Sequence, residues 1–364
     1  MIRLEKRHTP LRHATLVTLG LSLGMAFVVG ALVIGAFGAN PLTAYGVMLQ
    51  GALGSGYGLA EVAVKAIPLT LTGLAVALAA TMQLWNIGCE GQFVMGGIGA
   101  TWAALYLSPF LPPWLVLPAV ILCGAVMGMV WALIPAALKV WTNVSEILST
   151  LLLNYVAIII VEHLYFGPWR DPEGFGFPGT MTFPDEAMLP RLFDMRIHMG
   201  ILLAIAAALI LAAMLGRSKW GYATRVIGLG PRAAQYAGMN VGRNILLVMG
   251  ISGALAGLAG MGEVSAIHYR LQEGFASGYG FDGIIVACLA SLRPLRVPAC
   301  AVLLGIFLVG GEQLSTAMQL PSSISRILEG ALLFGFLLGE TLQRYHIRFG
   351  STAKARSVKD GANA

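Results

Sequence analysis

The sequence predicts an all-α integral membrane protein with about ten transmembrane helices, on three observations. Hydrophobic residues make up 57% of the 364 residues and charged residues only 11%, whereas a soluble domain has about 25% charged residues. Apolar runs of the length that crosses a bilayer as a helix recur along the chain. The 46 glycines are typical of helices that pack closely in lipid.

The candidate spans follow one another along most of the chain. They begin near Ala14, Leu59, Gln92, Trp114, Ile147, Met199, Asn244, Phe281, Val297 and Ile327, and the third, eighth and tenth are the shortest. The first follows a basic arm, as a secretory signal would, but it is long enough to span a bilayer and we expect it to be retained. We therefore expect one transmembrane domain over 1–364, with an arm at 1–13, a membrane bundle at 14–343 and a tail at 344–364.

Positive charge predicts the orientation, because Lys and Arg gather in cytoplasmic loops. With the N-terminus in the cytoplasm, ten spans return the C-terminus to the same side. The basic residues on that side are then Arg3, Lys6, Arg7, Arg12, Lys139, Arg217, Lys219, Arg225, Arg232, Arg243, Arg293, Arg296, Arg344, Arg348, Lys354, Arg356 and Lys359. The acidic, proline-rich loop at 167–198 falls outside and predicts an ordered cap or docking surface. The cytoplasmic loop at 217–243 predicts a short helix from Pro231 to Ala237, with proline in its first turn and Gly238 as its stop.

Motifs for nucleotide hydrolysis and metal binding are missing from the sequence. No GxxxxGK[ST], HExxH or GxSxG pattern occurs. The cysteines Cys89, Cys123, Cys288 and Cys300 are scattered and form neither a disulfide framework nor a metal-binding spacing. We therefore expect a chain that is not an enzyme, with no ATPase site, no catalytic residues, no metal site and no cofactor of its own.

Polar residues within or beside the apolar runs are the candidates for function, because they are costly in lipid. The segment at 85–92 carries Asn86, Glu90 and Gln92, with glycines at 88 and 91. These glycines permit a broken helix whose backbone lines a cavity. The same segment is also typical of a cytoplasmic turn with Glu90 at the N-terminus of the next helix. Both interpretations stay open.

A second polar group lies on the fifth span and a third at the entry to the eighth. Glu146, Thr150 and Asn154 share one helix face, which could line a path or hydrogen-bond to a neighbouring helix. Tyr155 beside them could stack on a flat ligand or pack in the core. Asp282 follows glycines that suit either an unwound re-entry or a solvated loop end.

Two further patterns concern packing. Gly253, Gly257 and Gly260 form a small-residue stripe that predicts a helix-packing surface. Glu61 and Lys65, four residues apart, are expected to pair with each other.

Four motifs in order resemble the permeases of ABC importers of the ribose/branched-chain amino acid type. They are WNIGCEGQ at 85–92, SEILSTLLLNY at 145–155, GYATRVIG at 221–228 followed by AAQYAG at 233–238, and GYGFDGI at 278–284. More narrowly, the chain resembles the nucleoside (guanosine-type) permeases that work with lipoprotein receptors of the basic membrane protein family. The resemblance covers residues 42–340, and the chain departs from it at Cys89 and Leu229.

The resemblance implies a permease subunit in the plasma (inner) membrane of a bacterium, which translocates a nucleoside by ATP-driven alternating access. It implies three partners: a cytoplasmic ABC ATPase, a second and related permease chain, and an extracytoplasmic substrate-binding protein; no nucleic acid is implied. The expected substrate pathway comprises Asn86, Glu90, Gln92, Glu146, Thr150, Asn154, Tyr155 and Asp282. The expected ATPase-coupling loop comprises Gly221, Tyr222, Arg225, Gly228, Pro231, Ala233, Ala234, Tyr236 and Gly238.

Two alternatives remain for the solute and the driving force. A different solute is the first: a simple sugar such as ribose, and after it branched-chain amino acids, because the permease sequence barely separates solutes that a receptor selects. An ion-coupled secondary transporter is the second. It would need an isolated carboxylate deep within a span and ordinarily a repeat symmetry, and the sequence shows neither plainly.

Overall fold

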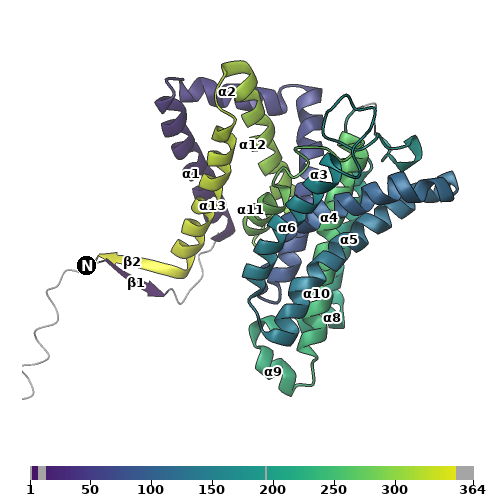
Figure 1. Cartoon of the computed structure of the whole chain (residues 1–364). Helices are drawn as coiled ribbons and strands as arrows, with labels where there is room; N and C mark the ends of the chain where they lie inside the picture. The colour runs from purple at the N-terminus through teal and green to yellow at the C-terminus, as the bar shows by residue number, and fades with distance from the viewer. Residues whose placement is uncertain (1, 7–13, 193–194, 350–364) are drawn as a thin grey trace, which may run out of the picture. The chain divides into compact units, whose positions relative to one another are not determined.

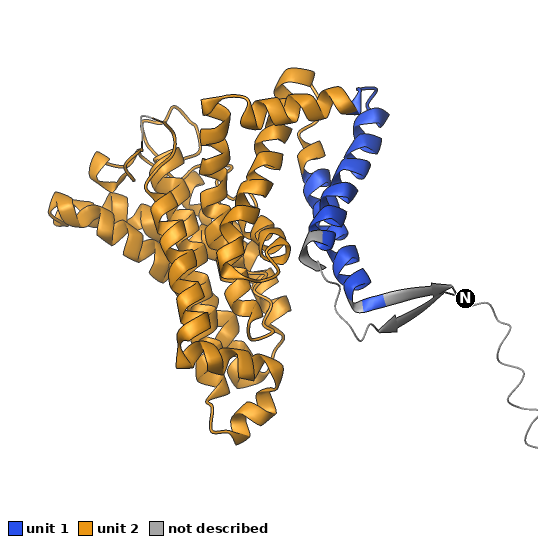
Figure 2. Ribbon diagram, turned by 180° about the vertical axis from the view of Figure 1, so that it is seen from behind, with its two compact units in different colours: residues 1–41, 326–364 blue, residues 42–325 orange. Residues whose placement is uncertain are grey.

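The computed structural model describes residues 2–6, 14–192 and 195–349, and it divides the chain into two compact units. Unit 1 combines residues 1–41 and 326–364, and unit 2 is residues 42–325 (Figure 2). The predicted single domain stays a prediction, and most of the predicted arm and tail lies outside the described residues.

Unit 1 brings the two ends of the chain together. Its elements are β1 (Ile2–Lys6), α1 (Ala14–Ala36), most of α13 (Ser323–Arg344) and β2 (Tyr345–Phe349). The strands pair antiparallel, with Ile2 opposite Phe349 and Lys6 opposite Tyr345 (Figure 1). This small sheet is a departure from the predicted all-α fold, which is otherwise confirmed in the part of the chain that the structure describes.

Glycines let the two helices of unit 1 approach closely. A Cβ on Gly335 would lie 2.6 Å from the Cα of Ser22, and one on Gly339 would lie 2.9 Å from the Cα of Thr18. Such contacts between backbones are how helices associate in lipid, where no hydrophobic force drives them together.

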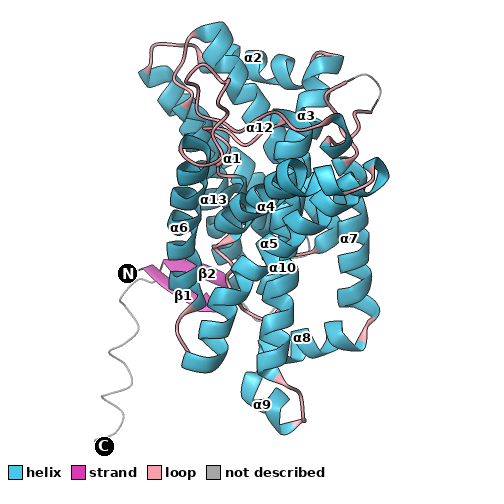
Figure 3. Ribbon diagram, turned by 45° about the vertical axis from the view of Figure 1, so that its right-hand side comes forward, coloured by secondary structure: helices cyan, strands magenta, loops and turns pink. Residues whose placement is uncertain are grey.

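The regular elements among the described residues of unit 2 are all helices, in the order α2 to α12 (Figures 1 and 3). The α-helices are α2 (Pro41–Leu53), α3 (Gly56–Ala80), α4 (Cys89–Trp102), α5 (Pro113–Thr142), α6 (Glu146–Phe166), α7 (Gly200–Arg217), α8 (Lys219–Leu229), α9 (Pro231–Tyr236), α10 (Val241–Glu263), α11 (Tyr279–Leu289) and α12 (Val297–Met318). Short π or 3-10 turns are η1 (Ala103–Leu107), η2 (Ser108–Phe110), η3 (Asp185–Ala187), η4 (Val264–His268) and η5 (Pro294–Arg296).

Helix α3 is the core of unit 2. It is buried along most of its length and packs against α7, α10, α11 and α12. No charged residue occurs after Lys65 in this helix, and a helix that is apolar all round is one that other helices surround. The outer helices α5, α6 and α7 instead leave apolar side chains such as Leu122, Leu152 and Leu209 exposed, as expected of surfaces that face lipid or a partner chain.

The predicted packing stripe on α10 is confirmed. A Cβ on Gly257 would lie 2.4 Å from the carbonyl oxygen of Gly124 on α5, and one on Gly260 would lie 1.9 Å from that of Phe93 on α4. A side chain at these positions would push the helices apart. The stripe therefore holds α4, α5 and α10 in backbone contact.

A helix occurs at each of the ten predicted span positions, but only eight helices in the described ranges are long and apolar enough to cross a membrane. Helix α11 has 11 residues and is too short. Helix α13 has 22 residues but carries Arg326, Glu329 and Glu340. The count of ten is thus not confirmed, and the orientation of the termini stays a prediction.

The loop at 167–198 folds back onto η4 and the residues just after it, as far as its described residues show. The backbone amides of Thr180, Phe183 and Leu189 donate hydrogen bonds to carbonyls at 271, 269 and 265. The order that its prolines predict is therefore present, and the loop covers one end of the unit.

Candidate functional site

Two helices, α4 and the 11-residue α11, begin inside unit 2. The segment before α4 lies at the middle of α10, because the Asn86 amide donates to Ser252, the central residue of Val241–Glu263. The start of α11 lies at the same place: a Cβ on Gly280 would meet the backbone nitrogen of Glu90 at 2.2 Å. Figure 3 shows α4 among the other helices of the bundle. We call this junction the α4–α11 break. It favours the broken-helix interpretation of residues 85–92 over the cytoplasmic turn.

The carboxylate of Glu90 joins the two helices at the break. Its Oε1 accepts from the amide of Gly278 at 2.9 Å and its Oε2 from that of Gly280 at 2.7 Å. Gly278 has φ 97°, a left-handed conformation that glycine adopts without strain. Glu90 also lies in the first turn of α4, so the positive ends of two helix dipoles point at one carboxylate. This explains how an acidic side chain only 1% exposed can be held inside the bundle.

A ring of amides ties the break to α3 and α10. The Nδ2 of Asn86 donates to Gln92 Oε1 and to Ser252 Oγ, both at 2.8 Å, and Gln92 Nε2 donates back to Asn86 Oδ1 at 2.9 Å. Ser252 Oγ in turn donates to the carbonyl of Ala75 at 2.7 Å. Buried polar networks in which the members are bonded to each other fix one arrangement of the helices around them.

Asn154 ties the same segment to α6. Its Nδ2 donates to the carbonyl of Ile87 at 2.9 Å and its Oδ1 accepts from the amide of Gly91 at 2.8 Å. Thr150, one turn before it, lies where a Cβ on Gly88 would come within 2.9 Å. One side chain thus satisfies two backbone groups of an irregular segment, which is how non-helical backbone is tolerated in a membrane.

The other predicted pathway residues lie apart or have separate surroundings. Glu146 forms an ion pair with Lys139 at 3.0 Å across the α5–α6 turn. Tyr155 is 60% exposed on α6, and Asp282 is buried in the first turn of α11. The structure therefore brings Asn86, Glu90, Gln92, Thr150, Asn154 and Asp282 to or near the break. Whether they line a solute path stays a prediction.

Three aromatic rings lie at the break that the sequence did not predict as site residues. Phe93 stacks on Phe275 with ring centroids 5.0 Å apart, and Tyr279 lies 6.0 Å from Phe93. The one sequence feature that accompanies these rings is Gly97. A Cβ at this position would lie 2.3 Å from Phe275 Cζ, so the glycine leaves room for the ring. Thr72 was also missed; its hydroxyl donates to the carbonyl of Tyr279 at 3.0 Å.

The expected pair between Glu61 and Lys65 is wrong. Arg196 donates to both carboxylate oxygens of Glu61 at 3.0 and 3.1 Å, and Lys65 donates to Glu312 at 2.9 Å. Partners from other elements hold each charge in a fixed geometry, which outweighs the weak attraction of an i,i+4 pair. No group of three or more His, Cys, Asp or Glu that could hold a metal occurs among the residues described here.

The loop at 217–243 presents two short helices, α8 and α9. Ser218 caps α8 by accepting from the amide of Gly221 at 2.9 Å. Helix α9 starts at Pro231 and the chain leaves it at Gly238 with φ 79°, as the sequence predicts. Figure 1 shows α9 at one extremity of unit 2.

Glycine sets how α8 sits on the bundle. A Cβ on Gly228 would lie 2.3 Å from the carbonyl oxygen of Thr81, just after α3, and one on Gly221 would lie 2.4 Å from that of Met214 on α7. Arg225 also donates to the carbonyl of Leu215. Tyr236 is 93% exposed at the end of α9. Helix α8 is thus held against α7 and the end of α3, and α9 beyond it ends in an exposed aromatic side chain.

Interrupted helices whose ends meet within a long-helix bundle are a recurrent feature of membrane transporters. The fold and the break therefore define a multi-pass transporter subunit. Residues 58–337 match the family described as branched-chain amino acid transport system / permease component, and the chain belongs to this family. It is thus an integral membrane permease component of an ABC transporter, as its motifs predict.

Curated relatives match almost the whole chain. The glucose ABC transporter permease TsgB13 of Haloferax volcanii is 33% identical over 95% of this chain and 93% of its own length. The guanosine ABC transporter permease NupP of Bacillus subtilis is 32% identical over 97% of this chain and 99% of its own length. The nucleoside ABC transporter permease NupB of Lactococcus lactis is 28% identical, with 86% and 88% covered.

Proposed function

We propose that this chain is the membrane-spanning permease subunit of an ABC importer for nucleosides. The observation that carries the proposal is the end-to-end similarity to a guanosine permease, at 32% identity over 97% of the chain. A second relative is a nucleoside permease. The import direction follows from the motif resemblance, which is to importers.

The proposed assembly has an ATPase beneath α8 and α9 and a binding protein above the loop at 167–198. The exposed Tyr236 and the basic residues Arg225 and Arg232 support the first contact. A second permease completes the pathway, since one chain leaves large apolar faces exposed on α5, α6 and α7. ATP hydrolysis belongs to the partner, and both termini lie on its side of the membrane.

In the proposed mechanism, the α4–α11 break is the point at which access alternates. Short helices held at their ends by Glu90 and Asn154 can tilt as units, because their own backbone bonds stay intact. Closure of the ATPase would move α8, and with it the ends of α3 and α7 on which α8 is seated. The polar side chains of the break would then be accessible to solute from one side of the membrane and afterwards from the other.

Asn154→Leu should lower the maximal rate of uptake at least tenfold with the complex still assembled. The substitution leaves the amide of Gly91 and the carbonyl of Ile87 without their partner, at about 1–3 kcal/mol each. Labelled-solute uptake and membrane abundance are the measurements. Leu152→Ala, on the exposed face of the same helix, is the matched control and should transport normally. Normal uptake by Asn154→Leu would remove this residue from the site.

A sugar is the second candidate solute, because a glucose permease is 33% identical over 95% of the chain. A panel of labelled purine and pyrimidine nucleosides, ribose, glucose and branched-chain amino acids separates the two, in cells with and without this gene. Loss of nucleoside uptake alone is the expected result. Loss of ribose or glucose uptake alone would show that the solute is a sugar and not a nucleoside, and the importer assignment would be kept.

A further inference from the structure

An ion pair lies well inside the predicted spans of unit 2. Lys65 is the tenth residue of α3 and Glu312 stands six residues before the end of α12; their side chains are 2.9 Å apart. At a rise of 1.5 Å per residue, Lys65 is about 13 Å from the start of α3 and Glu312 about 9 Å from the end of α12. Both charges therefore lie inside their helices, away from the helix ends and not in the connecting loops.

This ion pair is not enclosed by unit 2. The side chains of Lys65 and Glu312 are 24% and 63% exposed. Charged side chains inside spans are costly in lipid, so they pair with one another and face the bundle interior or a water-filled space. Thr316, one turn beyond Glu312 on the same face, is also exposed and polar.

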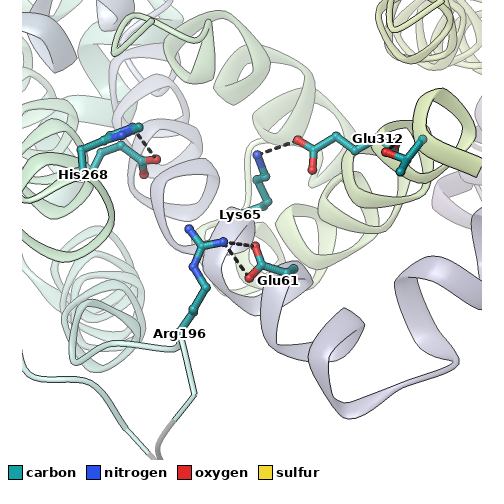
Figure 4. Close-up of polar contacts among 7 residues, drawn as sticks. Glu61, Lys65, Arg196, His268 and Glu312 are labelled. Atoms are coloured by element: carbon teal, nitrogen blue, oxygen red, sulfur yellow. Dashed lines mark hydrogen bonds and ion pairs between the residues drawn. The ribbon is translucent and has the colours of Figure 1, made fainter. Parts of the chain in front are cut away.

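Further charges extend this surface in both directions (Figure 4). Toward the loop at 167–198, Arg196 bonds Glu61 at 3.0 Å, one turn before Lys65. On α10 and η4, His268 lies 3.7 Å from Glu263. We call Glu61, Lys65, Arg196, Glu263, His268 and Glu312 the charged cluster.

The charged cluster leads to the α4–α11 break. The Lys65 ammonium lies 5.9 Å from the centre of the Tyr279 ring, and Tyr279 is the first residue of α11. The neighbouring amides of Gly278 and Gly280 are those that bind Glu90. A series of charged contacts thus runs from Arg196 at the end of the loop, along α3, to the place where the helices are interrupted.

The side chains of the charged cluster indicate which class of solute it contacts. Three carboxylates stand beside a lysine, an arginine and a histidine, so acceptors and donors alternate and the charge nearly balances. Carboxylates and cations in this arrangement hydrogen-bond to hydroxyl groups. A solute of strong net charge would be repelled, because a side chain of the same charge stands beside each side chain of opposite charge. We propose that the charged cluster lines the water-filled entrance of the permease and contacts a neutral, hydroxyl-bearing solute there. The solute part of this inference rests on the proposed import function.

Thiol labelling tests the entrance without requiring transport. Glu312→Cys and Thr316→Cys, each in the complete transporter in right-side-out membrane vesicles, would be treated with a charged, membrane-impermeant thiol reagent. Leu122→Cys is the matched control, because Leu122 stands nine residues inside α5 and is 63% exposed. The parent chain, whose four cysteines are retained, gives the background.

The expected result is labelling of both engineered positions on α12 at least tenfold faster than Leu122→Cys, and slower labelling when guanosine and the binding protein are present. Labelling as slow as in the control would overturn the proposal that the charged cluster lines a water-filled entrance, whatever the solute is. Fast labelling that neither guanosine nor ribose slows would overturn the contact with a hydroxyl-bearing solute.

Discussion

Gly228→Trp should abolish ATP-driven uptake while the chain still inserts into the membrane. A Cβ at this position would already lie 2.3 Å from the carbonyl oxygen of Thr81 and 3.0 Å from the Cα of Met82. An indole there must displace α8 from the end of α3, and α9 moves with it. We expect uptake to fall at least a hundredfold and the ATPase to be lost on purification.

The control for this variant is Gly230→Ala, two residues further on. A Cβ there would meet nothing closer than 3.7 Å, and the φ of −168° is open to any residue. It should keep at least half of the uptake. Tyr236→Ala should weaken ATPase binding without changing the fold, because this ring is 93% exposed. Wild-type uptake by Gly228→Trp would refute the coupling role of α8 and α9.

Glu90→Leu should both destabilise the chain and stop transport. It removes the acceptors of two buried amides, those of Gly278 and Gly280, at about 1–3 kcal/mol for each group left unsatisfied. It also removes the negative charge on which two helix N-termini converge. Thermal unfolding of the purified transporter and labelled-solute uptake are the two measurements.

Glu90→Gln should have an unfolding temperature and an uptake rate between those of the parent and of Glu90→Leu, because it keeps one acceptor and loses the charge. Glu173→Gln is the control: it removes an exposed carboxylate of the loop at 167–198 and should change neither readout. An unchanged unfolding temperature in Glu90→Leu would show that the carboxylate does not hold the break.

Much of the fold could be predicted because its signals are local. Runs of apolar residues placed a helix at each of ten positions. Proline and glycine placed α9 within one residue, since Pro231 and Gly238 act through their own backbone. The stripe of small residues on α10 found the packing surface in the same way.

The break could not be read in full from the sequence, because its contacts join distant segments. Counting spans by length assumes that each apolar run crosses the membrane, but α11 has 11 residues and starts in the middle of the bundle. Glu90 is bonded to amides 188 and 190 residues away. The segment at 85–92 therefore left two interpretations open that only the fold could separate.

Charged pairs were the hardest to predict, because helical spacing gives only one of their possible partners. Glu61 and Lys65 stand at the right distance on α3, yet their partners are Arg196 and Glu312, 135 and 247 residues away. Tertiary structure decides such pairs. The aromatic rings at the break were missed for the same reason, as Phe93 and Phe275 meet only in the folded chain.

The most direct test of an ATP-driven permease is solute uptake by the purified complex in liposomes, with ATP supplied only on the side of α8 and α9. We predict guanosine uptake that requires this ATP and the binding protein, and that persists when ionophores remove every ion gradient. Uptake that proceeds without ATP and stops with the ionophores would contradict the account and identify an ion-coupled transporter.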